Sequence, residues 1–333
     1  MQIPISIVAR TLLGRSLLVQ AAGAAIAAGG AAYYFTHPQR VLVDLPEDLA
    51  SRAESVTLAA ADGAALRAWW IPGERQNGKS CDRTVVHHHG FNGCAGVLMA
   101  RQALLGRRPL RLPMGDNGEG AQTGPLAAWP VVREGLGRGY NFLLVDARSH
   151  GRSEGPWDTS GVLQVSDAMR WAMWLHREQT QLWAGLWGHS YGAAIGLALA
   201  VRSSGGGYDA MVLDSPVLLA KGVYEGVIRK SAPLIGEPIY AVIQPVIQRV
   251  GNKTLYPMLR AHRPRMPILL IHGMEDGHVP AWQSEEAYEL MHDEADPDRT
   301  ALWLVPGAAH LEGLEVAAEE YVRRTLGWFD HWM

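Results

Sequence analysis

The segment LWAGLWGHSYGAAIGLALA, residues 182–200, joins a strand-like apolar run to a run of small residues with helical character. Between the two runs, Ser190 lies in the pattern Gly-x-Ser-x-Gly, with Gly188 and Gly192 on either side. A serine hydroxyl becomes an effective nucleophile only when it is held exposed in a strained turn beside a base. Flanking glycines let the chain turn sharply without a Cβ clash. The segment therefore predicts a nucleophilic serine on a strand–turn–helix unit.

Strand-like runs alternate with helical segments on both sides of this unit, which predicts a mostly parallel sheet covered by helices on both faces. Two helices are expected, one capped by Ser166 and continuing to Gln179, and one over residues 315–328. Residues 56–58 and 66–71 predict an antiparallel hairpin. With this hairpin, the predicted eight strands are completed by residues 84–89, 141–146, 182–187, 210–214, 268–272 and 301–305.

The composition is that of a globular enzyme, with 48% apolar and 19% charged residues among 333. This composition excludes a disordered chain. The formal net charge of −3 provides no basic surface, so we expect no nucleic-acid partner. Between about residues 216 and 265, helical potential is broken by several prolines. We therefore expect a short cap there, inside a single catalytic domain of residues 41–333.

The first forty residues have the character of a targeting segment. Arg10 and Arg15 precede an uncharged stretch, residues 16–39, that is long enough to span a bilayer. Its Ala and Gly content makes it weakly hydrophobic, and Ala25-Ile26-Ala27 offers a small-residue cleavage pattern. We expect residues 1–40 to be a signal peptide or a membrane anchor, with the catalytic domain anchored facing outward or exported. The opposing interpretation is a buried helix of a cytoplasmic protein.

Five short motifs follow one another along the chain, and together they carry a resemblance to a known family. They are HGF at 89–91, DARSHGRS at 146–153, GHSYG at 188–192, HGMEDGHVP at 272–280 and PGAAH at 306–310. In this order the chain resembles the α/β-hydrolase family, especially its esterase, lipase and serine-aminopeptidase-like branches. The resemblance extends from about Val56 to the carboxyl terminus. It implies an α/β-hydrolase fold with a serine nucleophile.

The resemblance also implies the partners of Ser190, in the chain order Ser, Asp, His. It identifies Asp276, which follows the seventh strand, as the acid and His310, which follows the eighth, as the general base. Glu275, the neighbour of Asp276, is an alternative acid. Asp214, at the end of the sixth strand, is another, because some members of the family have the acid there.

An oxyanion hole needs two backbone N–H groups directed at the developing charge. One is expected from Tyr191, directly after the nucleophile. The resemblance assigns the other to Phe91.

Two further polar stretches are rich in residue types that form sites. His87 and His89 would share one face of a strand and His88 the other, so the three cannot converge on one ion, and we expect no metal. The loop 146–153 is expected to be a structural turn near the pocket, with Arg148 and His150 held in hydrogen bonds.

These observations predict a serine hydrolase that cleaves carboxylic esters through an acyl-enzyme, without a cofactor. The expected partner is a small ester, with membrane association through the amino-terminal segment. Peptide and thioester hydrolysis use the same constellation and remain open. An alternative of a different class is a non-catalytic, membrane-anchored interaction protein with a hydrolase-like fold.

We predict that a protein beginning near Pro38 stays in solution and keeps full activity on a small ester, because all five motifs lie after Val56. Full-length protein should partition with membranes or appear outside the cytoplasm in processed form, which cell fractionation and immunoblotting measure. Aggregation or inactivity of the shortened protein would instead favour the buried-helix interpretation.

Overall fold

The computed structural model describes residues 38, 40–74, 82–99, 110–111, 126–156, 161–202, 205–219, 222 and 255–333. Almost all of the expected targeting segment (1–40) and most of the expected cap (216–265) lie outside these residues. None of the helices within the described ranges reaches the length and hydropathy that a membrane span requires.

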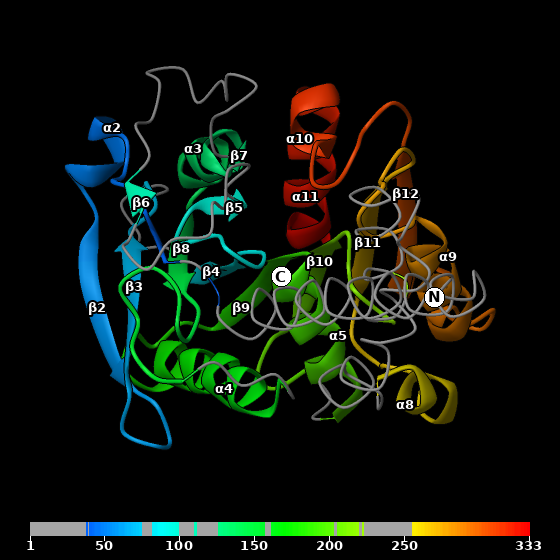
Figure 1. The fold of residues 1–333 in the computed structure, drawn as a ribbon, viewed down its shortest axis with the longest axis horizontal. Coiled ribbons are helices and arrows are strands. Elements are labelled where there is room, and N and C mark those ends of the chain that lie inside the picture. The colour runs from blue at the N-terminus through cyan, green and yellow to red at the C-terminus, as the bar shows by residue number, and fades with distance from the viewer. Residues whose placement is uncertain are drawn as a thin grey trace, which may run out of the picture.

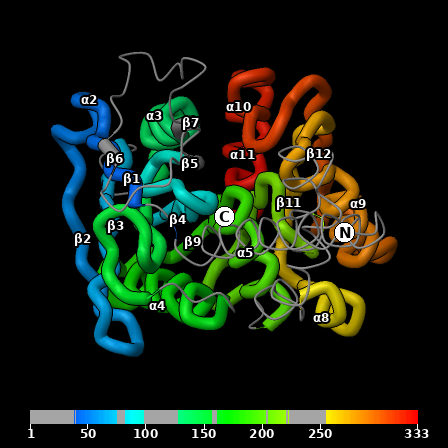
Figure 2. Tube along the Cα trace, in the orientation of Figure 1, coloured from blue at the N-terminus to red at the C-terminus, as the bar shows by residue number. Residues whose placement is uncertain are grey.

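The centre of the molecule is an eight-stranded sheet with the order β12-β11-β10-β9-β4-β8-β3-β2. Antiparallel pairing is confined to β2–β3 and β3–β8, and the remaining neighbours are parallel. The colours of Figure 2 run from blue strands at one edge to orange strands at the other. The predicted strands are all present, as β2 (Glu54–Ala59), β3 (Ala65–Ile71), β4 (Arg83–His88), β8 (Tyr140–Asp146), β9 (Trp183–His189), β10 (Ala210–Asp214), β11 (Ile268–Gly273) and β12 (Thr300–Val305).

Helices cover both faces of this sheet, as the alternation of elements predicted. Figure 1 shows α3 (Trp129–Gly137) and α11 (Ala318–Trp332) on one side and α4 (Val162–Arg177) and α5 (Tyr191–Arg202) on the other. The remaining helices are α2 (Glu47–Ala50), α8 (Leu255–Ala261), α9 (Trp282–Met291), α10 (Gly313–Val316) and the 3-10 turn η1 (Pro297–Arg299). Two short pairs complete the described elements, β1 (Val41–Leu42) with β6 (Leu110–Arg111) and β5 (Val97–Met99) with β7 (Leu126–Ala127).

Strand β8 shows why the central strands are continuous apolar runs in the sequence. Successive side chains of a strand point to opposite faces. Leu143 and Val145 pack in the core under α4 and α5, and Phe142 and Leu144 pack in the core under α3 and α11. Because both faces are covered, no position of β8 faces water, and all seven of its residues are buried.

The two predicted helices differ from the structure in their limits. Helix α4 begins at Val162, not at Ser166, and is preceded by Gly161 with φ 74°. Ser166 is therefore an interior residue of the helix and not its cap. The carboxyl-terminal helix is divided at Ala317, where φ −138° and ψ 53° are not helical, so Val316 belongs to α10 and is 49% exposed.

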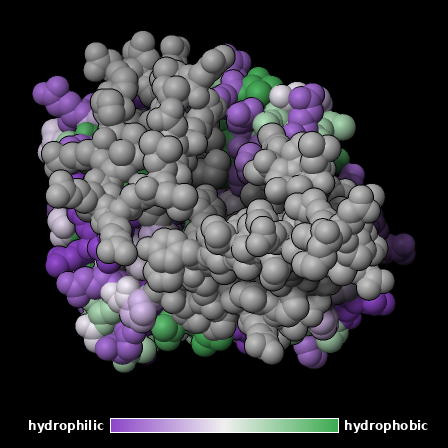
Figure 3. Space-filling model, in the orientation of Figure 1, coloured by the Kyte–Doolittle hydropathy of each residue, from purple (hydrophilic) through white to green (hydrophobic). Residues whose placement is uncertain are grey.

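Large exposed apolar side chains come from several separate elements of the described chain. Figure 3 shows hydrophilic and hydrophobic residues mixed around the rim of one face. Single exposed apolar residues are normal on protein surfaces, so these side chains do not by themselves define a binding surface. They are Val162, Met173, Leu182, Trp183, Met274, Trp282 and Val316.

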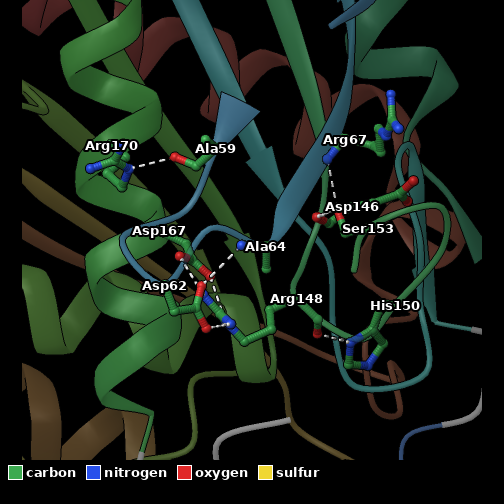
Figure 4. A network of polar contacts seen from close by, with 10 residues as sticks. All are labelled: Ala59, Asp62, Ala64, Arg67, Asp146, Arg148, His150, Ser153, Asp167 and Arg170. Atoms are coloured by element: carbon green, nitrogen blue, oxygen red, sulfur yellow. Dashed lines mark hydrogen bonds and ion pairs between the residues drawn. The ribbon is translucent and has the colours of Figure 1, made fainter. Parts of the chain in front are cut away.

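The loop that follows β8 is fixed by a buried arginine. Arg148 is 1% exposed, and its guanidinium donates to both oxygens of Asp167 on α4, each at 2.9 Å. It also donates to Asp62 in the β2–β3 turn, at 2.7 Å and 3.2 Å. Figure 4 shows both carboxylates directed at the guanidinium. The ion pairs tie this loop to two rigid elements, in agreement with the structural role expected for Arg148.

Five histidines are buried around the carboxyl ends of the central strands, and burial keeps them neutral. Burial is the largest cause that lowers the pKa of each ring, because it penalises the charged form. The pKa falls to about 3 for His88, His150 and His189, to about 4 for His89, and well below its ordinary value for His87.

We predict that the protein loses stability steeply as the pH falls below about 6.5, the pKa of an unfolded histidine. Below that pH each of these histidines binds a proton in the unfolded chain but not in the folded protein. The free energy of unfolding therefore falls by about 1.4 kcal/mol per pH unit for each such histidine. Denaturant unfolding at pH 7.5, 6.5 and 5.5, chosen to span about one unit on each side of that pKa, measures the effect.

Burial raises the pKa of three aspartates, Asp146, Asp167 and Asp214. At lower pH the folded protein therefore binds protons on these carboxyl groups before the unfolded chain does, which offsets part of the loss of stability. A free energy of unfolding that stayed level across the three pH values would show that these histidines are protonated in the folded protein.

Candidate active site

Ser190 lies between the end of β9 and the start of α5, in a strained backbone conformation. Its φ of 51° is in the left-handed region, which non-glycine residues rarely adopt. The Ser190 N–H donates to the carbonyl oxygen of Asp214 on β10 at 2.8 Å, which holds this conformation. The residue is only 8% exposed. This is the strand–turn–helix geometry that the sequence predicted.

The two glycines of the turn are required by close contacts and not by their own dihedral angles. Positive φ falls on Ser190, and neither Gly188 nor Gly192 has it. A Cβ on Gly192 would lie 2.2 Å from the carbonyl oxygen of His88, at the end of β4. A Cβ on Gly188 would lie 2.7 Å from the carbonyl oxygen of Gly192. The glycines therefore let helix α5 begin directly against the sheet.

His310 connects Ser190 to Asp276. Its Nδ1 lies 2.6 Å from Asp276 Oδ2, and its Nε2 lies 3.0 Å from Ser190 Oγ. All three residues are less than 10% exposed. Because the carboxylate accepts the Nδ1 proton, the lone pair of Nε2 faces the serine hydroxyl, as a general base requires. The structure thus brings together the three residues that the sequence analysis singled out.

The Asp276 carboxylate accepts hydrogen bonds on both oxygens. Its Oδ1 accepts from the backbone N–H groups of His278 and Val279, each at 2.8 Å. Its Oδ2 also lies 3.2 Å from Nε2 of His272, which is fully buried at the end of β11. Burial raises the pKa of Asp276, but the charge of His310 and the hydrogen bonds from His272 and His310 outweigh it. The net pKa is well below the ordinary value, so the carboxylate is ionised.

His272 was not recognised in the sequence as part of this site. The available signal was its position, at the end of a buried strand and four residues before the expected acid. Its Nδ1 lies 2.6 Å from the hydroxyl of Ser284 on α9, and its Nε2 also lies 2.8 Å from the carbonyl oxygen of Val279. Because the Val279 carbonyl and the Asp276 carboxylate can only accept, Nε2 carries a proton, which lies between Val279 O (2.8 Å) and Asp276 Oδ2 (3.2 Å).

The two alternative acids, Glu275 and Asp214, have contacts that differ from those of Asp276. Glu275 is exposed, and its backbone N–H donates to the carbonyl oxygen of Ala308. Asp214 is 2% exposed and accepts hydrogen bonds from the hydroxyls of Tyr321 (2.7 Å) and Ser215 (2.9 Å). The carboxylate that contacts the His310 ring is that of Asp276.

The loop that carries His310 lies against the end of β11. A Cβ on Gly273 would be 2.4 Å from the carbonyl oxygen of Ala308, so only glycine permits the observed approach. The N–H of Met274 donates to Val305 at 3.0 Å, and that of Glu275 to Ala308 at 2.9 Å. These backbone contacts fix the spacing between the Asp276 turn and the histidine.

Phe91 and Tyr191 follow the ends of two neighbouring parallel strands. In the register of β4 and β9, His88 pairs with Gly188, so each of the two residues comes three positions after a paired residue. Tyr191 is the first residue of α5, and N–H groups in the first turn of a helix point out of its amino-terminal end. Both candidate donors therefore lie at the same edge of the sheet, beside Ser190.

The rings of His87, His88 and His89 have different partners. Nε2 of His87 lies 3.2 Å from Nδ1 of His189, and Nε2 of His88 lies 3.5 Å from the Tyr208 hydroxyl. His89, one residue beyond the strand, contacts the backbone of the next residue and of the loop after β8. Within the part of the chain that the structure describes, no three His, Cys, Asp or Glu side chains form a group suited to a metal ion.

This chain is similar in sequence to one group of known proteins and in fold to several solved structures. The uncharacterized protein YfhR of Escherichia coli K12 is 26% identical over 266 residues, which are 78% of this chain and 74% of that protein. The esterase Pf2001 of Pyrococcus furiosus superposes with a TM-score of 0.66 at 23% identity, over 90% of this chain and 98% of its own. The acylaminoacyl peptidase of Pyrococcus horikoshii superposes with a TM-score of 0.57 at 15% identity, over 84% of this chain and 41% of its own.

The family model described as the prolyl oligopeptidase family matches residues 135–333, which is more than half of the chain. The matched region contains Ser190, Asp276 and His310 and ends with α11. The superposed structures have the same fold as the eight-stranded sheet with its flanking helices. The chain belongs to the prolyl oligopeptidase family and is a serine hydrolase with the α/β-hydrolase fold.

Proposed function

We propose that this protein hydrolyses carboxylic esters of modest size, with Ser190 as nucleophile, His310 as general base and Asp276 as the orienting acid. The observation that carries the proposal is the continuous contact from Ser190 Oγ through the His310 ring to Asp276, at 3.0 Å and 2.6 Å. Hydrogen-bonded contact between nucleophile, base and orienting acid is the geometric signature of an activated serine.

In the first half of the reaction, Nε2 of His310 takes the proton of the Ser190 hydroxyl while Oγ attacks the ester carbonyl carbon. The tetrahedral intermediate collapses when the C–O bond to the alcohol breaks and His310 returns its proton to the departing alkoxide. The acyl group is then bonded to Oγ. Asp276 stays ionised throughout, because its pKa is far below neutral pH, and it stabilises the imidazolium that forms.

In the second half, His310 removes a proton from water and the resulting hydroxide attacks the acyl carbon. The bond to Oγ breaks, the proton goes back to Oγ, and the carboxylic acid is released. Water supplies the only other reactant, so the reaction balances without a cofactor.

We assign stabilisation of the negative oxygen to the backbone N–H groups of Tyr191 and Phe91. Their position after the ends of two adjacent parallel strands, on the same side of the sheet edge as Ser190, supports this assignment. Backbone donors on a helix start and a short turn are held in advance, so they need no reorganisation during the reaction.

We propose ester cleavage before peptide cleavage because the structural match covers more of the esterase than of the peptidase. The Pyrococcus furiosus esterase is matched over 98% of its chain, whereas the acylaminoacyl peptidase is matched over 41%. Peptide hydrolysis is the second candidate, because the family model is that of prolyl oligopeptidases. Parallel assays with p-nitrophenyl acetate and with an acylated aminoacyl p-nitroanilide separate the two.

We predict that Ser190→Ala abolishes hydrolysis of p-nitrophenyl acetate and labelling by a fluorophosphonate probe, because both need the activated hydroxyl. Loss of a triad member typically lowers turnover by several orders of magnitude, to about 10⁻⁶ of the starting value for the nucleophile. In-gel fluorescence and release of p-nitrophenolate are the measurements. A variant that still labels, or that keeps more than a trace of activity, would exclude Ser190.

We predict that Asp276→Asn lowers kcat by about 10⁴-fold, because the amide presents its N–H to the ring and favours the wrong tautomer of His310. The matched control is Glu275→Gln, the same chemical change one residue away at an exposed position. It should alter kcat by no more than about twofold, as expected for a surface substitution without contacts to the site. Equal losses in the two variants, or the reverse order, would mean that the acid is misassigned.

A further inference from the structure

The turn after β4, residues 89–95, is hydrogen-bonded to the segment at the end of β8 and the loop that follows it, residues 146–156. Contacts at three points join them, and each involves a backbone N–H group and a buried side chain. They are Ala147 N–H to His89 Nε2 (3.0 Å), Asn92 N–H to His150 Nε2 (3.2 Å) and Ala95 N–H to Asp146 Oδ1 (2.7 Å). Phe91, the proposed second oxyanion donor, lies between the first two of these points.

The peptide group that carries the Phe91 N–H is fixed on its carbonyl side. The Gly90 oxygen accepts from His89 Nδ1 at 2.7 Å and from the Gly93 N–H at 3.0 Å. In a planar trans peptide, the C=O and N–H groups point in opposite directions, so these bonds determine where the Phe91 N–H points. The next peptide group, between Phe91 and Asn92, donates its N–H to Nε2 of His150 at 3.2 Å.

His150 can accept this bond only as the neutral Nδ1–H tautomer. Its Nδ1 donates to the carbonyl oxygen of Arg148 at 3.0 Å, which leaves the lone pair on Nε2 for the Asn92 N–H. Burial, the largest cause, and the neighbouring His89 lower the pKa of His150 to about 3, so the ring is neutral at physiological pH. The ring also packs edge-on against Phe91, with centroids 5.7 Å apart.

The loop that presents His150 is itself rigid (Figure 4). Arg148 is paired with Asp62 and Asp167, as described above. On the other side of His150, the hydroxyl of Ser153 donates to the carbonyl oxygen of Asp146 at 2.6 Å and accepts from the Arg67 N–H of β3 at 2.7 Å. The loop that carries His150 is thus bonded to the sheet and to α4, and His150 connects it to the turn after β4.

We propose that His150 is a positioning residue for the oxyanion hole: its Nε2 holds the peptide group after Phe91, as the bonds to the Gly90 oxygen hold the peptide group before it, and together they keep the Phe91 N–H directed at the substrate oxygen. This inference rests on the proposed function. Asn92 is in the left-handed region with φ 61°, and the bond from its N–H to His150 helps to hold this conformation. Without that bond, the turn would lose the support on one side of Phe91, and its N–H would be displaced while Ser190, His310 and Asp276 stay in place.

A matched pair of amide substitutions tests the proposal. The amide of glutamine reaches the position of Nε2, and that of asparagine reaches only the position of Nδ1. We expect His150→Gln to retain most of the activity. We expect His150→Asn to lower kcat on p-nitrophenyl acetate by about ten- to a hundredfold, as for an oxyanion donor that is displaced by up to about 1 Å and not removed, with KM nearly unchanged. Affinity for a trifluoromethyl ketone (octylthiotrifluoropropanone), whose adduct with serine carries an oxyanion, should fall in parallel with kcat/KM.

A remote histidine provides the control for lost stability. His176, near the end of α4, also contacts backbone carbonyl oxygens with both ring nitrogens, at Gln181 and Gly207. His176→Asn should leave kcat and ketone affinity unchanged. Hydrogen exchange of the Asn92 amide gives a readout independent of activity, and its protection should be lost in His150→Asn and kept in His150→Gln. If the asparagine variant does not fold, His150→Leu, which fills the space without an acceptor, replaces it in the same assays.

The outcomes separate this inference from the proposed function. If wild-type protein is labelled by the fluorophosphonate and hydrolyses the ester, but His150→Asn and His150→Gln have equal kcat and ketone affinity, His150 does not position the donor and the proposed function stands. If wild-type protein is neither labelled nor active, the proposed function fails and this inference fails with it.

Discussion

At the end of β9 the N–H of Ser190 donates to the Asp214 carbonyl oxygen at 2.8 Å, and one strand further the N–H of Ser215 donates to Ile271 at 2.8 Å. Both serines have φ near 50°, so the sheet ladder continues through residues in a conformation they would not adopt alone. For Ser190 this bond determines where the hydroxyl points and where α5 begins. The contact of Oγ with His310 and the place of the Tyr191 N–H at the helix start both depend on that direction.

The electrostatics of the site divide its polar groups into two sets. Asp276 is surrounded by N–H donors and stays ionised, whereas burial raises the pKa of Asp146 and Asp214. Among the neutral buried histidines behind the strand ends, His89 and His150 accept backbone N–H groups on Nε2, whereas Nε2 of His88 donates to the Tyr208 hydroxyl, whose own proton goes to the Ala168 carbonyl oxygen.

The sequence predicted all eight strands of the sheet, because β10 and its neighbours are buried on both faces and leave a continuous apolar run. It also singled out the three residues that meet at His310, from motifs that follow strand ends. It missed the contact of His272 with Asp276 and that of His150 with Asn92, since both depend on which loops the fold brings together. The start of α4 was misplaced at Ser166 because Gly161, which precedes the helix, is a weak amino-terminal signal.

The contacts of Gly188, Gly192 and Gly273 have a consequence for how this enzyme can evolve or be engineered. An added methyl group at any of them would strike main-chain atoms, such as the carbonyl oxygens of His88 and Ala308, and not a side chain that could be exchanged. No second-site substitution can therefore make room, since every residue type carries the same carbonyl. Libraries that aim at new substrates should leave these three codons unchanged and vary positions whose neighbours are side chains.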